Sequence, residues 1–339
     1  MTKLKLLPNI IFVLAALSPA LIVMLYQFGW GTALNLDIAI GSALFLELIC
    51  LRLAKKKVHL NQFASSLLIG VFIGVSLPPF SPWWIIVFAT VLSILGKNAF
   101  GTKNKHPFNA AMIGYAGTLV SFPGYLATWI IPKSLDLGTS QQLSLSDSLA
   151  ITFQTKNIPD SMTGATALEI FKFSNDGLMV DQIYQSNKIF HEAFFIISGW
   201  EWINIAFLAG GIFLLMTKKI SWESPFAMLA TIVFLSLIFF DNGSSKSGGS
   251  PIMHLLGGAT MIGAFFIITD PASAPSTSRG KIIFGSIVGF FIYIIRVWGG
   301  YPDAIAFAVL LGNFSVPLID RLTMGQISSK DFDKSTGQN

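Results

Sequence analysis

The sequence predicts an all-α polytopic membrane protein with about ten transmembrane helices. Hydrophobic residues make up 53% of its 339 residues and charged residues only 12%, whereas soluble proteins average about 25% charged residues. The mean hydropathy of +0.67 points the same way. The apolar residues also gather into long runs, and a run of about 20 residues spans the bilayer as a helix because lipid offers no hydrogen-bond partners to the backbone.

Ten apolar runs are predicted to cross the membrane. Five of them precede a long polar segment and five follow it. The third to the fifth are short for a full span, so some of them are candidates for re-entrant or broken helices. In chain order the predicted spans are 10–25, 34–53, 63–77, 83–95, 109–122, 202–216, 225–240, 252–268, 282–297 and 304–319.

The polar segment divides the chain into parts. We predict a first transmembrane half over 1–121, a loop over 122–199, a second half over 200–322 and a tail over 323–339. An odd number of spans in each half inverts the second half relative to the first, which is the arrangement of inverted-repeat transporters. A polar connection as long as 122–199 is usually either functional or disordered.

The positive charges favour one orientation. If the N-terminus is cytoplasmic, sixteen of the 22 lysines and arginines fall on the cytoplasmic side and six on the other. Short cytoplasmic loops are enriched in these residues. We therefore expect a multi-pass protein of the inner (cell) membrane, embedded in membrane lipid, with both termini and the tail in the cytoplasm and the 122–199 loop outside it.

The composition also excludes several kinds of site. The net charge is +5, but the basic residues are dispersed and form no patch or stripe, so nucleic acid is not an expected partner. Cys50 is the only cysteine, which excludes an intrachain disulfide and a four-cysteine iron–sulfur site. The sequence has neither a Walker loop nor a dinucleotide-binding glycine motif, so we do not expect NADH to bind here.

The most informative stretch lies in the middle of the long loop and reads Asp-Ser-Met-Thr-Gly-Ala-Thr-Ala-Leu from Asp160 to Leu168. Gly164 is expected to let the backbone bend tightly, so that the hydroxyls of Thr163 and Thr166 are exposed. Four residues of the Thr-Gly-Ala-Thr kind also occur in ordinary loop turns. The interpretation of this motif therefore depends on further evidence from the rest of the chain.

This stretch resembles the flavin-attachment motif of the NqrB/RnfD family, the membrane subunits of the sodium-pumping NADH:quinone oxidoreductase and of the Rnf electron-transport complex. The resemblance implies that the phosphate of FMN esterifies Thr166, through an extracytoplasmic flavin transferase. Asp160, Thr163, Gly164 and Ala165 match the rest of the recognition pattern, with threonine at 163 where serine is usual. The resemblance also implies a second, non-covalent riboflavin, to which no residues are assigned.

The resemblance extends over most of the membrane region. It implies two five-helix halves related to urea transporters. It also implies partners, namely the other Rnf-type subunits, which supply iron–sulfur clusters and a nucleotide-binding flavoprotein. The matching motifs are HPFNAA from His106, HLLGG from His254, GAFF from Gly263, TDP from Thr269 and RVWGGYP from Arg296.

Charged residues near the apolar runs are further candidates, because ionisable groups in a membrane are costly and often functional. We expect Arg296 to pair with Asp303, either as a structural pair or while helping to hold a flavin phosphate. Glu47 and Glu201 are candidates for an ion or proton path, although Glu201 is close enough to an interface to be solvated instead. The four histidines lack metal-ligand spacing and are expected to be structural: His59, His106, His191 and His254.

The predicted function is that of a D-type subunit of an Rnf-like, ion-translocating complex that passes electrons through FMN on Thr166. Three alternatives stay open. An NqrB-like quinone reductase subunit is disfavoured because the first span begins near residue 10. A urea-transporter-like channel or transporter would share the two halves without redox function. A standalone relay would work with a different oxidoreductase.

Overall fold

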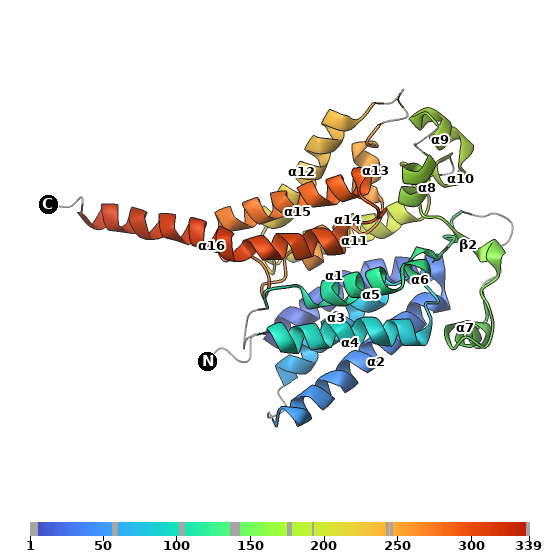
Figure 1. Ribbon diagram of the computed structural model, residues 1–339, viewed down its shortest axis with the longest axis horizontal. Coiled ribbons are helices and arrows are strands. Elements are labelled where there is room, and N and C mark those ends of the chain that lie inside the picture. The colour runs from blue at the N-terminus through green and yellow to red at the C-terminus, as the bar shows by residue number, and fades with distance from the viewer. Residues whose placement is uncertain are drawn as a thin grey trace.

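The computed structural model describes residues 6–55, 60–101, 106–135, 143–174, 178–191, 193–241, 244 and 247–336. The protein is mostly helical, as its composition predicts (Figure 1). In the described part of the chain the helices form two groups that pack against each other, one from each side of the long central segment. His59 lies outside the described residues, so its expected structural role is not addressed.

Each predicted span of the first half corresponds to one helix. Gly29 separates the first two helices with a φ of 63°, which an L-residue with a side chain rarely adopts. Asn109 begins the fifth helix as its N-cap, since its side-chain oxygen accepts a hydrogen bond from Met112 N at 3.2 Å. The helices are α1 (Leu6–Phe28), α2 (Trp30–Leu53), α3 (Leu60–Ser76), α4 (Trp83–Phe100) and α5 (Ala110–Ser121).

The second half departs from the prediction at one place. The predicted span 252–268 is not one helix but three consecutive pieces, because the chain leaves the first of them at Gly257 and takes a φ of 58° at Gly258. The predicted tail boundary at residue 323 falls inside a continuous helix. The elements are α11 (Trp200–Met216), α12 (Glu223–Phe239), α13 (Pro251–Leu256), α14 (Thr260–Ile262), the π-helix η2 (Gly263–Ile267), α15 (Ser278–Trp298) and α16 (Ile305–Thr336).

Five of the described helices are long and apolar enough to cross a membrane, judged by length and composition. They are Asn9–Phe28, Trp30–Leu53, Trp83–Phe100, Ser278–Trp298 and Ile305–Met324. Four further apolar helices are shorter: Gln62–Ser76, Ala110–Ser121, Trp200–Met216 and Glu223–Phe239. These helices are those of a multi-pass membrane protein. The count of ten crossings and the inverted repeat stay predictions.

The two halves meet along matching helices. Helix α1 packs on α11 and α5 packs on α16, so the first and the last helix of each half face their counterparts. The α1–α11 contact is close because Gly210 lies against the carbonyl oxygen of Ala16, where a Cβ atom would clash. Such small residues allow helices to approach closely in lipid, where the hydrophobic effect does not drive helix association.

The central segment folds into short elements at one end of the bundle. The described chain begins and ends at the opposite end of the bundle (Figure 1). The predicted polar loop is therefore largely structured in its described part. Its elements are α6 (Pro123–Ala127), β1 (Trp129–Ile130), α7 (Leu145–Thr152), the 3₁₀ turn η1 (Asp160–Met162), β2 (Thr163–Gly164), α8 (Ala167–Ser174), α9 (Val180–Ser186) and α10 (Lys188–His191).

Candidate functional site

Thr166 lies between a small sheet and a helix. Strand β2 pairs with β1 in antiparallel register, with Trp129 opposite Gly164 and Ile130 opposite Thr163. Two residues later the chain enters α8, so Thr166 is the residue directly before a helix. The sheet therefore fixes the chain on the N-terminal side of Thr166, and the helix fixes it on the C-terminal side.

The side chain of Thr166 caps this helix together with Glu169. The Thr166 hydroxyl donates to Glu169 Oε2 at 3.0 Å, and the Thr166 N–H donates to the same oxygen at 2.8 Å. In return, Glu169 N–H donates to Thr166 Oγ1 at 3.4 Å. This reciprocal pair is a capping box. The sequence analysis missed it, although Thr-Ala-Leu-Glu matches the Ser/Thr-x-x-Glu signature.

The other motif residues support this turn. Asp160 is exposed and begins η1, and its carbonyl oxygen accepts a hydrogen bond from the Thr163 hydroxyl at 3.2 Å. Gly164 is not the tight bend that we predicted, because it lies in a strand and has no positive φ. Its small size matters instead, since a Cβ atom there would lie 3.0 Å from Ile131 Cγ1. Ala165 is exposed beside Thr166.

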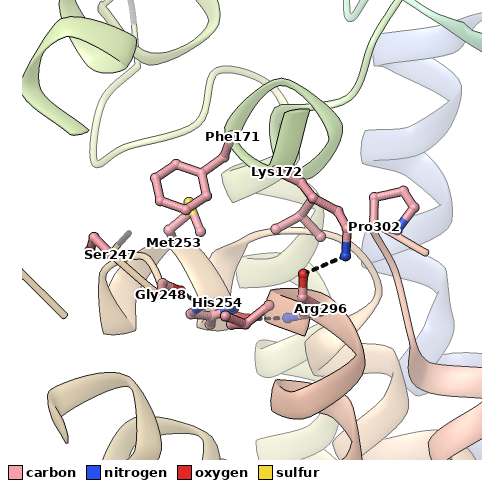
Figure 2. A pocket seen from close by; sticks show the side chains of 10 residues that line it. Phe171, Lys172, Ser247, Gly248, Met253, His254, Arg296 and Pro302 are labelled. Carbon is pink, nitrogen blue, oxygen red and sulfur yellow. Dashed lines mark hydrogen bonds between the residues drawn. The ribbon is translucent and has the colours of Figure 1, made fainter. Parts of the chain in front are cut away.

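Helix α8 docks on the second transmembrane half. Its buried face comprises Ala167, Leu168 and Phe171. Lys172 extends from the same helix to the end of α15, where its ammonium donates to the carbonyl oxygen of Arg296 at 2.9 Å (Figure 2). It also donates to the carbonyl oxygens of Ile295 at 3.2 Å and Tyr301 at 3.4 Å. Partial burial lowers the pKa of Lys172 below its ordinary value.

Arg296 holds together the break that follows α13. Its guanidinium donates to the carbonyl oxygens of His254 at 2.8 Å and Gly257 at 3.4 Å, which lie at the end of that helix. It also pairs with Asp303 Oδ1 at 3.1 Å, so the predicted Arg296–Asp303 pair is confirmed. Asp303 Oδ2 in turn accepts from Ala259 N at 2.9 Å. These contacts give Arg296 a structural task, while its contact with a flavin phosphate stays a prediction.

A cavity of about 40 Å³ lies between α8, α13 and the end of α15 (Figure 2). Ligand pockets usually have about 300–1,000 Å³, so this cavity is too small for an isoalloxazine ring. The lining residues are Leu168, Phe171, Lys172, Ser247, Gly248, Met253, His254, Arg296, Val297 and Pro302.

The surroundings of Thr166 fit a phosphate ester in two respects. The side chain is half-buried beside the exposed Ala165, at the edge of the surface. A phosphate on Thr166 would also sit at the N-terminus of α8, where helix N–H groups favour negative charge. Glu169 disfavours a phosphate on Thr166, because its carboxylate accepts a hydrogen bond from the hydroxyl that would be esterified. Esterification would replace that hydrogen bond and move Glu169 away.

Glu47 and Glu201 have different roles in the structure. Glu201 is 1% exposed, and it accepts the backbone N–H groups of residues 194 to 197 at 2.8–3.4 Å. The alternative that Glu201 is merely solvated is therefore wrong, because its carboxylate caps a turn that precedes α11. Glu47 pairs with Lys97 at 3.2 Å, and this pair between α2 and α4 keeps Glu47 a candidate for an ion path.

The histidines form no metal site in the described part of the chain, where no group of three or more metal-binding side chains occurs. His254 is buried and its Nε2 donates to the carbonyl oxygen of Gly248 at 2.7 Å. His106 lies just before α5, and its backbone N–H donates to Ala272 O at 3.0 Å. The side-chain contact of His254 agrees with a structural role, while the role of the His106 imidazole stays a prediction.

Removal of the Glu169 carboxylate is expected to loosen the start of α8. Glu169→Ala should cost about 1 kcal/mol of local stability, because the N–H of Thr166 loses its acceptor. Hydrogen exchange of the amides of residues 167–170 would then be about fivefold faster. Glu169→Gln keeps an acceptor and is the matched control. Equal exchange rates in Glu169→Ala and the unaltered protein would show that docking alone holds the helix.

The model of the NQR2, RnfD, RnfE family matches residues 4–328. Three curated relatives each carry the name of the D-type subunit of the ion-translocating oxidoreductase complex. The relative from Cellvibrio japonicus is 43% identical over 317 residues, which cover 92% of this chain and 88% of the relative. That from Pectobacterium atrosepticum is 40% identical over 326 residues, 92% of each chain. That from Pseudomonas aeruginosa is 42% identical over 314 residues, 92% of this chain and 88% of the relative.

Proposed function

The chain belongs to the NQR2, RnfD, RnfE family, and on that premise we propose that it is the D-type subunit of an Rnf-type ion-translocating oxidoreductase complex. In this complex it relays electrons through FMN esterified to Thr166. The resemblance to the family is thus confirmed, while the flavin, the ion and the complex belong to the proposal. The other subunits of the complex, the flavin transferase and membrane lipid are its proposed partners.

One observation carries the proposal. The motif that resembles a flavin-attachment site lies at the end of the bundle opposite both ends of the described chain (Figure 1). The distribution of lysines and arginines independently favours an extracytoplasmic position for the same segment. A hydroxyl at this end is accessible to an enzyme that works outside the cytoplasm. We accordingly propose the cell (inner) membrane as the location and cytoplasmic termini as the topology.

In this proposal the chain positions Thr166 as the attachment point of the flavin, and it contributes little else to the binding of the flavin ring. The pairing of β1 with β2 holds the motif before Thr166, while the buried face of α8 and the three hydrogen bonds of Lys172 hold the helix after it. FMN, when bound, supplies the electron-transfer chemistry, and the protein supplies position and electrostatics. A covalent link prevents loss of the flavin from a site that the chain leaves open.

The small cavity supports a position for the ring between subunits. With about 40 Å³ available under α8, the cavity beside the motif is too small for the isoalloxazine ring in the described part of the chain. We propose that the ring lies on the surface at the end of the helix bundle that carries α8, where a neighbouring subunit covers it. A second, non-covalent riboflavin remains part of the proposal on family resemblance alone.

Peptide mass analysis tests the proposal. The protein is purified from cells that contain the flavin transferase, denatured and digested. The peptide that contains Thr166 is expected to gain the mass of FMN less one water, and to carry flavin fluorescence. Cells without the transferase are the control. An unmodified Thr166 peptide from cells that contain the transferase would contradict the proposal, and a colourless protein that passes small solutes would favour the urea-transporter-like alternative.

A further inference from the structure

A groove of about 360 Å³ opens on the outer face of α12 and α15, far from the flavin motif. Its walls are apolar and aromatic, apart from the hydroxyls of Thr231 and Ser286. Several of its side chains are exposed in the described structure: Trp222 at 56%, Phe226 at 64%, Phe234 at 63% and Ile282 at 42%. The lining residues are Trp222, Phe226, Ala227, Ala230, Thr231, Phe234, Ile282 and Ser286.

The shape of the groove follows from two glycines. Gly285 lies against the carbonyl oxygen of Ser224, and a Cβ atom at Gly289 would lie 2.6 Å from Met228 O. The backbones of α12 and α15 therefore touch, and the larger side chains on either side stand up as walls. From Trp222 to Phe234 the groove follows roughly 18 Å of helix at 1.5 Å per residue, which is comparable to an extended acyl chain.

One end of the groove is polar and basic. Lys281, next to the lining residue Ile282, donates to Ser221 Oγ at 2.9 Å. Segments 217–223 and 276–281 meet here and carry four basic residues, Lys218, Lys219, Arg279 and Lys281, against one acidic residue of their own, Glu223. A second carboxylate, that of Asp320 from α16, accepts the Ser276 N–H at 2.9 Å beside them. Glu223 is buried, and Lys219 is turned away toward Asn9 at 3.1 Å and the ring of Phe12. The net charge at this end is positive.

Two helices also begin at this end. Helix α12 starts at Glu223 and α15 starts at Ser278, so the positive ends of both helix dipoles lie near Lys281. In the proposed topology this end faces the cytoplasm, where basic pockets between transmembrane helices bind phospholipid headgroups. Trp222 at the same end has the position of an interfacial tryptophan.

We propose that this groove binds one anionic phospholipid of the cytoplasmic leaflet. An acyl chain lies along Phe226, Ala230 and Phe234, and the phosphate lies at Lys281 and Ser221 between the two helix starts. The ligand class follows from the combination of an apolar furrow of acyl-chain length with a positively charged end. The lipid would brace α12 against α15. The inference requires the proposed orientation but not a flavin on Thr166.

Lipid binding to the full-length chain tests the inference. The protein in mild detergent is titrated with phosphatidylglycerol and phosphatidylcholine of equal chain length, and bound lipid is counted by native mass spectrometry. We expect about fivefold tighter binding of phosphatidylglycerol, which Lys281→Gln removes. Ala230→Trp fills the groove and should abolish retention of either lipid. Ile238→Trp, at an exposed position of the same helix that does not line the groove, is the matched control.

Three results would overturn the inference. The first is equal binding of both lipids to the unaltered protein. The second is full retention of lipid by Ala230→Trp. The third is a cross-link in the purified complex from Ala230→Cys to a transmembrane helix of another subunit, because that helix would then occupy the groove. Each of these outcomes is independent of flavin fluorescence at Thr166, so failure here is distinguishable from failure of the proposed electron relay.

Discussion

Thr166→Ala is expected to eliminate covalently bound flavin from the protein. The substitution removes the only hydroxyl that the motif offers at the start of α8, so no phosphoester can form there. It also removes the helix cap, at a cost of about 1 kcal/mol. In-gel flavin fluorescence of the denatured protein, produced with the flavin transferase, should fall to background, while the amount of protein in the membrane changes little.

Two matched variants separate chemistry from folding in this experiment. Thr163→Ala removes the hydroxyl that donates to Asp160 O and that belongs to the expected recognition pattern, so it should lower the fluorescence without abolishing it. Glu169→Ala loosens the same cap but keeps the Thr166 hydroxyl, so it should also retain flavin. Fluorescence that persists in Thr166→Ala and disappears in Thr163→Ala would move the attachment point to residue 163.

Arg296→Met is expected to have the largest effect on stability. The variant keeps most of the apolar stem but removes the guanidinium. The Asp303 carboxylate then lacks its cation, and the carbonyls of His254 and Gly257 keep only the Thr260 hydroxyl as a donor. Loss of one partner of a buried pair costs about 3–5 kcal/mol. The thermal unfolding midpoint in detergent should fall well below that of the unaltered protein.

The control for this variant is Arg321→Met, since Arg321 is exposed on α16. It should leave the midpoint unchanged. The comparison also decides between the two roles predicted for Arg296. If Arg296→Met kept its midpoint but lost flavin fluorescence, Arg296 would serve the cofactor and the structural account would be wrong. A lower midpoint with retained fluorescence would make it a structural residue alone.

The pattern of apolar runs predicted most of the architecture correctly. A helix lies at nine of the ten predicted spans, because hydropathy over a dozen or more residues is a strong signal that local context rarely reverses. The exception is the span 252–268. Its hydropathy is continuous, and the break depends on Gly258, which has a φ of 58° and lies so close to Asp303 and Leu168 that there is no room for a side chain.

The candidate site was predictable in part. Motif resemblance pointed to Thr166, and the Arg296–Asp303 pair was expected from seven residues of separation across a Gly-Gly-Tyr-Pro turn. The task of Glu201 was not predicted, because its four N–H donors come from a turn whose conformation no propensity rule specifies. The contacts of Lys172 were not predicted either, since they join residues more than 120 positions apart.

The sequence by itself determined that this is a helical membrane protein, which segment stands apart from the apolar runs, and which threonine resembles a flavin-attachment site. These properties follow from composition and from contiguous residues. Three properties were decided only by the tertiary structure. Helix α8 is held at the end of α15, Arg296 stabilises the break after α13, and the cavity beside them is too small for a flavin ring. Each of these depends on carbonyl oxygens left unpaired where helices end, and the partners for such groups come from distant segments that only the folded chain brings within hydrogen-bonding distance.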